Sequence, residues 1–203
     1  MSAYPLVIEG VGLTALVVGG GSIGTRKTLA LLRVGAMVHV VSREITEALA
    51  DAAGDHTGLR ITRAAYVPDL MGDELLIIAA TDDPSTNAAI AADARARGRL
   101  VNVVSAPHLG NCATPAVHRA GEVVIAVSAG GVPNAAVRIR DALGRTIDTR
   151  YAKAVADLAT LRRVLLDDGH RERWNQAMNA LVSADFCRQV ESGELDGRIA
   201  EWR

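Results

Sequence analysis

The stretch LVVGGGSIGTRK, residues 16–27, decides the fold of the chain. It begins inside the apolar run LTALVV, residues 13–18, which is typical of a parallel strand covered on both faces. A helical pattern begins at Ser22, and Gly35 is placed to end that helix. A second apolar run, residues 37–41, then follows. The sequence therefore predicts a strand, helix and strand unit with a glycine-rich loop at its first turn.

Three glycines in this loop, Gly19, Gly21 and Gly24, match the pattern GxGxxG. In a dinucleotide-binding site they turn the chain, let the backbone approach a pyrophosphate, and pack the helix closely against the strand. Glycines can also serve only a tight packing turn. Because the motif lies between a good strand and a good helix, dinucleotide binding is the favoured interpretation. The unpaired N–H groups of the helix, which begins with Ser22 and Ile23, would then bind the pyrophosphate.

The end of the second strand bears on the choice between NAD and NADP. An acidic residue there usually accepts hydrogen bonds from the adenine ribose of NAD, but the chain has Ser42, Arg43 and Glu44 at this place. An arginine suits the 2′-phosphate of NADP, and Arg43 could equally be a solvated loop residue. The residues alone leave both cofactors open.

Strands and helices continue to alternate up to residue 104, which predicts a Rossmann-type, doubly wound parallel sheet of the α/β class. Asp83 and Pro84 are typical of a helix start, and Gly98 of a helix end. The elements expected after the first unit are a helix at about 44–53, strands near 59–66 and 74–80, a helix ending near 97, and a strand at 100–104.

After Pro107 the pattern changes, and the segments CATPAVH (112–118) and EVVIAVS (122–128) predict a hairpin. A helix is expected at 134–147, and the rest is helical to Trp202, with interruptions near 167–170 and 192–193. The expected organisation is a dinucleotide-binding domain at 1–110, a small α+β dimerisation segment at 111–150, and a helical C-terminal domain at 151–203.

Composition excludes several classes of partner. The formal charge of the 203 residues is −1 and aromatic residues make up 3%, so no nucleic-acid partner is expected. No apolar run long enough to span a membrane and no signal-peptide pattern occurs, so we expect a cytoplasmic protein without a membrane partner. Cys112 and Cys187 form no CxxC pair, and the histidines show no metal-ligand spacing, so no metal site is expected.

Four segments extend the local motif over the chain: GGGSIGTRKTLALLRVGA (19–36), AATDDPSTN (79–87), NVVSAPHLGNCATPAV (102–117) and VVIAVSAGGVPNAAVRIRDAL (123–143). In order and spacing they resemble the precorrin-2 dehydrogenase and sirohydrochlorin ferrochelatase family, which includes the N-terminal module of siroheme synthases. The resemblance implies a homodimer that uses NAD to oxidise precorrin-2 to sirohydrochlorin. Some members also insert ferrous iron, which makes ferrous iron a candidate substrate. Because the chain ends at Arg203, it resembles the stand-alone form.

The resemblance also implies site residues. Ser22, Ile23, Arg43 and Glu44 correspond to dinucleotide contacts, which favours NAD over NADP. The loops at 81–83 and 102–105 would line the nicotinamide end at the carboxyl edge of the sheet. The cofactor-binding residues expected are Gly19, Gly21, Ser22, Ile23, Gly24, Arg43, Glu44, Thr81, Asp82 and Asn102.

The main departure from the family lies at Ser105, where relatives commonly carry an aspartate to which proton transfer is assigned. A serine hydroxyl is a poor base at pH 7, and a positioned base contributes about 10² to 10⁴-fold to rate. Dehydrogenation can proceed if water, a substrate carboxylate or His108 takes the proton. Iron insertion must remove two pyrrole protons without a hydride acceptor, which makes it the less expected activity. The catalytic residues expected are Ser105 and His108.

A smaller departure follows Ser128, a position that can be phosphorylated in at least one relative, because Pro133 comes one residue earlier than in the family. Precorrin-2 carries eight carboxylates, so a basic cleft is required, but the sequence does not rank its arginines. Two alternatives stay open. One is a tetrapyrrole or nucleotide sensor without catalysis, and the other is an NADP-dependent reductase of another substrate.

Overall fold

The computed structural model describes residues 3–203. The chain forms two compact units that divide after Thr114, and each is described by itself. The division into three parts at residues 110 and 150 stays a prediction.

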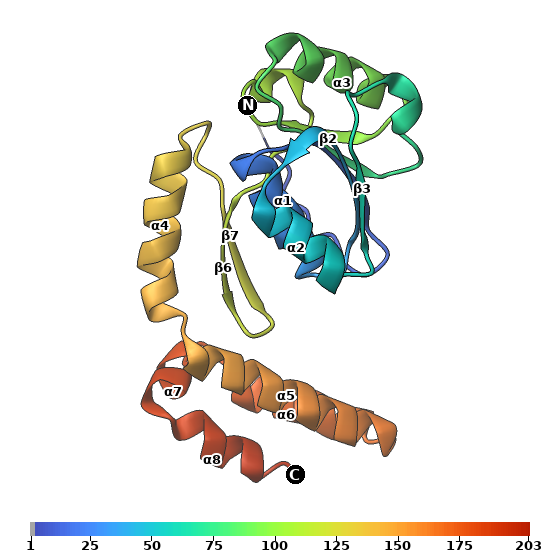
Figure 1. The fold of residues 1–203 in the computed structure, drawn as a ribbon. Helices are drawn as coiled ribbons and strands as arrows, with labels where there is room; N and C mark the ends of the chain where they lie inside the picture. Colours follow the sequence, from blue (N-terminus) through green and yellow to red (C-terminus); the bar gives the residue numbers. More distant parts are fainter. Residues whose placement is uncertain (1–2) are drawn as a thin grey trace. The chain divides into compact units, whose positions relative to one another are not determined.

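The first unit is built on a parallel sheet of five strands in the order β3-β2-β1-β4-β5 (Figure 1). This confirms the Rossmann-type fold class. The strands are β1 (Thr14–Gly20), β2 (Met37–Ile45), β3 (Leu59–Thr62), β4 (Leu76–Ala79) and β5 (Leu100–Val103). The helices are α1 (Ser22–Leu32), α2 (Glu47–Asp55) and α3 (Pro84–Ala96), with two short 3₁₀ turns, η1 (Pro68–Leu70) and η2 (Pro107–Leu109).

Alternate side chains of the strands fill two apolar layers, one on each face of the sheet. Leu16, Val18 and Ile77 belong to the layer that α3 covers through Ile90 and Ala94. Val17, Val40 and Ile78 belong to the layer that receives Leu32 of α1 and Leu49 of α2. Burial on both faces explains why β1 and β4 are continuous apolar runs in the sequence.

The sheet grows from β1 in both directions, first on one side through β2 and β3 and then on the other through β4 and β5. Through α1 the chain passes from β1 to its neighbour β2, whereas from β3 it crosses to β4 on the other side of β1. The loops after β1 and β4 therefore diverge, and a crevice opens between them at the carboxyl ends of the strands. The fold places the glycine loop and the loop at 81–83 on the two sides of this crevice.

Strand β2 is longer than the sequence suggests. The expected helix start at 44 is wrong, because the strand runs on to Ile45 and pairs with Gly20 after a register shift in β1. Helix α2 begins at Glu47, and the Thr46 hydroxyl caps it by accepting a hydrogen bond from the Leu49 N–H at 3.3 Å. Arg43 and Glu44 consequently lie on an extended strand.

The second unit begins with the expected hairpin, β6 (Ala116–Ala120) and β7 (Val123–Val127), and α4 packs against both of its strands. Helices α4 (Pro133–Thr146), α5 (Thr149–Asp167), α6 (Arg171–Leu181), α7 (Phe186–Ser192) and α8 (Glu194–Ala200) follow (Figure 1). Helices α5 to α8 share one apolar core, which includes Leu161, Leu181 and Ile199.

The helical part of this unit has one break that the sequence does not predict. Helix α6 ends at Leu181, although no glycine or proline follows it. The Arg198 guanidinium of α8 donates a hydrogen bond to the Ala180 carbonyl at 2.7 Å, which supplies a partner that a helix end otherwise lacks. This contact joins α6 to α8, whose bonded residues are 18 positions apart in the chain. None of the helices in the described chain is both long and apolar enough to cross a membrane.

Candidate functional site

A cleft of about 850 Å³ lies at the carboxyl edge of the sheet in the first unit. It is lined by the ends of β1 and β2, the first residues of α1, and the loops that follow β3 and β4. The lining residues are 18–23, 41–46, 64–66, 80–83 and 86. Among the expected cofactor contacts, the structure brings together in this lining Gly19, Gly21, Ser22, Ile23, Arg43, Glu44, Thr81 and Asp82.

The three motif glycines meet three different surroundings. Gly19 has a φ of 113°, and a Cβ there would lie 2.4 Å from the Ala80 carbonyl oxygen. A Cβ on Gly24 would lie 1.8 Å from the Gly19 carbonyl oxygen, so only glycine lets α1 approach the loop this closely. A Cβ on Gly21 would meet nothing within 4 Å. Local packing therefore explains glycine at 19 and 24 but not at 21, where space is left open beside the backbone.

Helix α1 differs from the other helices of this unit at its N-terminus. Asp83 caps α3 and Thr46 caps α2, whereas Gly21 at the start of α1 offers no side-chain acceptor. The N–H groups of Ser22, Ile23 and Gly24 precede the first intrahelical bond, which the Thr25 N–H donates to the Gly21 carbonyl at 2.9 Å. An uncapped helix start at the rim of a cleft suits a bound anion.

Side-chain hydrogen bonds hold the glycine loop in place. The Gly20 N–H donates to the Ser42 hydroxyl at 2.9 Å, and that hydroxyl donates to the Glu44 carbonyl at 2.6 Å. The Thr25 and Thr46 hydroxyls are joined at 2.7 Å, and Thr25 also reaches the Gly20 carbonyl at 3.3 Å. The loop is thus attached to β2 and to the start of α2, so its backbone is preorganised for a ligand.

The loop after β4 is ordered by its own polar groups. The Asp83 carboxylate accepts hydrogen bonds from the backbone N–H groups of Ser85 and Thr86 at 3.0 and 3.1 Å. The side-chain hydroxyls of Thr86 and Ser85, followed by these N–H groups, lower the pKa of the Asp83 carboxyl to about 2. Asp83 is therefore charged at neutral pH and already engaged, which leaves the neighbouring exposed Asp82 free to meet a ligand.

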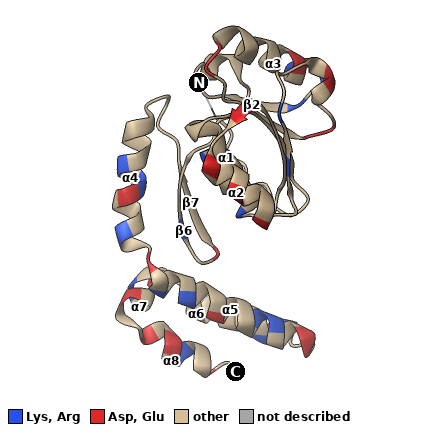
Figure 2. Ribbon diagram, in the orientation of Figure 1, with Lys and Arg blue, Asp and Glu red and all other residues tan. Residues whose placement is uncertain are grey.

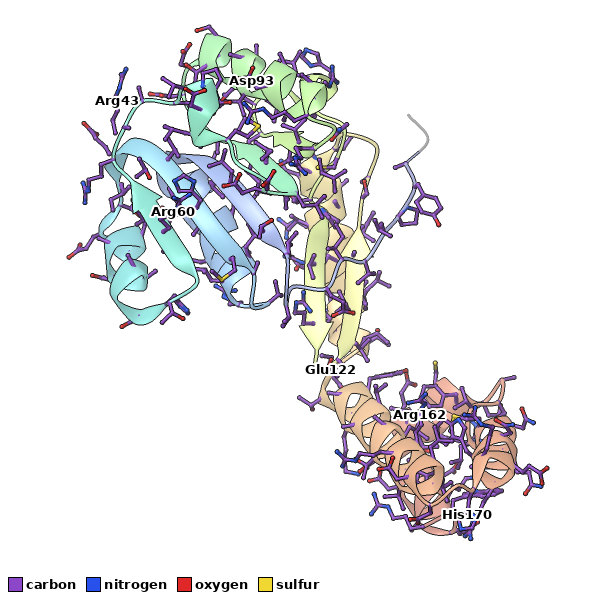
Figure 3. All side chains as sticks on the ribbon, turned by 90° about the vertical axis from the view of Figure 1, so that its right-hand side faces the viewer. Arg43, Arg60, Asp93, Glu122, Arg162 and His170 are labelled. Carbon is purple, nitrogen blue, oxygen red and sulfur yellow. The ribbon has the colours of Figure 1, made fainter. Side chains whose placement is uncertain are left out.

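Tyr66 lines the cleft although the sequence analysis did not single it out. Its hydroxyl donates to the Asp93 carboxylate of α3 at 2.8 Å, and burial together with this bond raises the tyrosine pKa. Figure 3 labels Asp93 on α3 and shows the exposed side chain of Arg43 at the end of β2. No local motif marks Tyr66, because its place in the cleft depends on how the loop after β3 folds back.

Several expected site residues lie outside the cleft lining. Gly24 is buried behind the loop, as its packing role requires. Asn102 is 7% exposed and donates to the Cys112 carbonyl at 3.2 Å, so its side chain secures the segment that leaves β5. Ser105 and His108 are exposed in the loop after β5. Their functional assignments, like those of the cleft residues, stay predictions.

The Ser105 hydroxyl is connected to the cleft through one buried side chain that the sequence analysis passed over. Asn87 of α3 is 1% exposed, and its amide contacts both Thr81 and Ser105. Asparagine in the first turns of a helix is ordinary, so no sequence signal marked it. In residues 3–203 the His, Cys, Asp and Glu side chains form no group of three that could hold a metal ion.

Comparison with known proteins agrees with this geometry. A family model described as putative NAD(P)-binding matches residues 6–116, which is more than half of the chain. The chain belongs to this family. The matched residues contain the complete parallel sheet and the glycine loop.

Siroheme synthases are similar to the chain along nearly all of its length, which confirms the resemblance seen in the sequence. The enzyme of Chromobacterium violaceum is 38% identical over 209 residues, covering 98% of this chain and 44% of that protein. The enzyme of Saccharophagus degradans is 32% identical over 202 residues, covering 99% and 41%. The chain therefore spans less than half the length of these relatives.

Among solved structures, the chain is similar to one described as SirC, precorrin-2 dehydrogenase. The TM-score is 0.77 at 24% sequence identity, and the match covers 98% of this chain and all of the other. This likeness shows that the two chains share a fold over their whole length, the hairpin and C-terminal helices included.

Proposed function

We propose that this chain is an NAD-dependent dehydrogenase that oxidises precorrin-2 to sirohydrochlorin. The observation that carries the proposal is the open space at Gly21 beside the uncapped N-terminus of α1. A dinucleotide pyrophosphate needs close backbone approach and unpaired N–H groups at the same place. The similarity to siroheme synthases, and to a protein described as a precorrin-2 dehydrogenase, supports the substrate.

Charges in the cleft favour NAD over NADP. Among the lining residues, Arg43 is the single positive side chain, whereas Glu44, Asp82 and Asp83 are negative. The N-terminus of α1 offers partners for two phosphates. A third phosphate near the end of β2 would also meet the exposed Glu44 carboxylate, which offsets the attraction of Arg43. We expect NAD to bind about tenfold more tightly than NADP, and Glu44→Gln to narrow that difference.

The chain's own residues divide the work between two ends of the site. Gly21, Ser22 and Ile23 bind the pyrophosphate, and Arg43 and Glu44 lie at the adenosine end. Thr81 and Asp82 border the nicotinamide end, where bound NAD supplies the hydride acceptor. Ser105 and His108 then face the substrate, and His108, water or a substrate carboxylate accepts the proton released with the hydride.

The second unit offers cationic groups for a substrate with eight carboxylates. Lys and Arg residues are distributed along α4 and α5 (Figure 2). Within the described residues, the exposed Arg138, Arg145, Arg162 and Arg163 take part in no salt bridge. Guanidinium groups bind carboxylates in a bidentate manner, so these arginines are candidates for substrate contact.

We further propose that the protein acts as a homodimer in the cytoplasm.

Turnover tests the proposal directly. Purified protein is mixed with NAD and freshly generated precorrin-2, and sirohydrochlorin and NADH are followed by absorbance. Equal amounts of both products are expected, since each oxidation transfers one hydride and releases one proton. Folded protein that binds NAD and precorrin-2 but forms no product would instead be a sensor. Turnover only with NADP, or only with another substrate, would favour a reductase of different specificity.

A further inference from the structure

Asn87 is a buried polar side chain beside the site, and it is 1% exposed. Its Oδ1 accepts hydrogen bonds from the Thr81 N–H at 3.2 Å and from the Thr81 hydroxyl at 2.8 Å. Its Nδ2 donates to the Thr81 carbonyl at 2.9 Å and to the Ser105 hydroxyl oxygen at 3.2 Å. An amide offers two donors and two acceptor positions, so its capacity is used in full.

The backbone determines which way this amide is turned. The Thr81 N–H can only donate and the Thr81 carbonyl can only accept, so Oδ1 must face the first and Nδ2 the second. Consequently the group that Asn87 presents to Ser105 is a donor. The Ser105 oxygen must accept, and its own hydrogen is left to donate elsewhere. Because Ser105 is exposed, that hydrogen is available to a ligand.

Sheet register places the two bonded residues at equivalent points. Ala79 of β4 pairs with Val103 of β5, so Thr81 and Ser105 each follow a paired position by two residues. The two loops leave adjacent parallel strands at the same edge, and Asn87 joins them from α3.

We propose that Asn87 is a positioning residue that holds the Ser105 hydroxyl as a hydrogen-bond donor toward the substrate. This inference rests on the proposed function, because it assigns to Ser105 a donor role in that reaction. A serine in this setting orients or polarises a substrate oxygen. The proton released on oxidation then goes to water, to a substrate carboxylate or to His108.

Asn87→Asp reverses the direction of the hydrogen bond while it preserves the shape of the side chain. The carboxylate retains acceptors for the Thr81 N–H and hydroxyl but can no longer donate to Ser105 or to the Thr81 carbonyl. The Ser105 hydroxyl would then donate to the carboxylate and be lost to the substrate. We expect kcat to fall about 10-fold to 100-fold, with the KM for NAD changed by less than about threefold.

Asn111→Asp is the matched control. The Asn111 side chain also bridges backbone groups of this unit, since it accepts from the Val101 N–H at 2.7 Å and donates to the Arg99 carbonyl at 2.9 Å. Its replacement removes one amide donor from a backbone carbonyl without touching Ser105. A kcat within about twofold of the unmodified protein is expected for this variant.

A double-mutant cycle separates positioning from simple support of the loop. Ser105→Ala should lower kcat by a similar factor, and Asn87→Asp should add less than about twofold in that background. If the two effects multiply, Asn87 acts on the loop and not through Ser105, and the proposal is overturned. If the Asn87→Asp protein does not fold, Asn87→Ala, which introduces no charge, replaces it in the double-mutant cycle.

A measurement without substrate distinguishes failure of this inference from failure of the proposed function. In a Ser105→Cys, Cys112→Ser, Cys187→Ser protein, the rate of iodoacetamide alkylation against pH reports the pKa of the new thiol. A donating Asn87 amide stabilises the thiolate, so this pKa should rise when Asn87→Ala is added, a change that removes the donor without introducing a negative charge. An unchanged profile would contradict the inference even if precorrin-2 oxidation is observed. A shifted profile without turnover would instead overturn the proposed function alone.

Discussion

The glycine loop after β1 and the loop after β5 lie at the same edge of one sheet, yet they differ in how their properties arise. In the glycine loop, the constraint on Gly24 arises five positions away, where it packs on the Gly19 carbonyl. In the loop after β5, Ser105 depends on Asn87, which lies 18 residues away in the chain. The close packing of Gly24 on Gly19 is visible in the glycine spacing of the sequence, whereas the contact between Asn87 and Ser105 leaves no motif.

The largest effect is expected from Gly24→Ala, which disrupts the packing of Gly24 on the Gly19 carbonyl. Gly24→Ala places a methyl group 1.8 Å from a backbone oxygen, so either α1 or the loop must move. We expect the free energy of unfolding to fall by about 3 kcal/mol, together with loss of NAD binding. Chemical denaturation and calorimetric titration measure the two effects. Unchanged stability would show that the loop yields more easily than its packing indicates.

Gly21→Ala sharpens the comparison within the same loop. Space around this position is open and its φ of −71° suits alanine, so stability should change by less than about 0.5 kcal/mol. Binding of NAD should weaken about 10-fold to 100-fold, because the methyl group occupies the space left for the pyrophosphate. Equal NAD affinity for this variant and the unmodified protein would place the dinucleotide elsewhere.

Ser105→Asp addresses the loop after β5. A carboxylate there would receive the Asn87 amide donor and serve as a base, so we expect precorrin-2 oxidation to accelerate about tenfold or iron insertion to appear. Product formation with NAD, and metal incorporation with ferrous iron, are followed separately. The control is Ser105→Asn, which has a similar shape but no basic oxygen. No change in either activity would remove position 105 from the mechanism.

The smallest effect is expected far from both loops, at His39 on β2. Its ring contacts the Thr62 hydroxyl and the Arg60 guanidinium at 2.9 Å each, and the Glu74 carboxylate at 3.5 Å. Burial and then Arg60 lower the pKa of His39 from its ordinary value of 6.5. The folded state therefore favours the neutral ring, and its stability contribution is present above pH 6.5 and lost as pH falls through the lowered pKa.

Denaturation of the His39→Gln protein at several pH values between about 7 and 5 measures this contribution. The variant should show a weaker loss of stability with acid than the unmodified chain. His56→Gln is the matched control, because His56 is exposed in the same unit. Identical pH profiles for the His39 variant and the unmodified protein would contradict the assignment.

Much of the fold could be predicted because its elements are marked locally. Continuous apolar runs identified β1 and β4, and Asp83 with Pro84 identified the start of α3. The continuation of β2 to Ile45 was not predicted from the sequence, because it depends on pairing with Gly20 across the sheet. The end of α6 at Leu181 was not predicted either, since no glycine or proline marks it; the Ala180 carbonyl there accepts a hydrogen bond from α8.

The candidate site divides in the same way. Gly21 was expected at the cofactor from the glycine motif, Ser22 from the family resemblance and Thr81 from its loop after a strand, and the structure puts all three in the cleft lining. Tyr66 and Asn87 carried no recognisable pattern. Asn102 was expected at the nicotinamide end as part of the loop after the fifth strand, and its buried amide donates to the Cys112 carbonyl.

The sequence by itself determined the parallel sheet and the dinucleotide motif, since hydrophobic period and glycine spacing act over neighbouring residues. Only the tertiary structure decided which glycine faces open space and which hydroxyl is held as a donor. Those properties depend on backbone groups from separate strands and helices meeting at one edge, and their positions are set by packing of the whole unit.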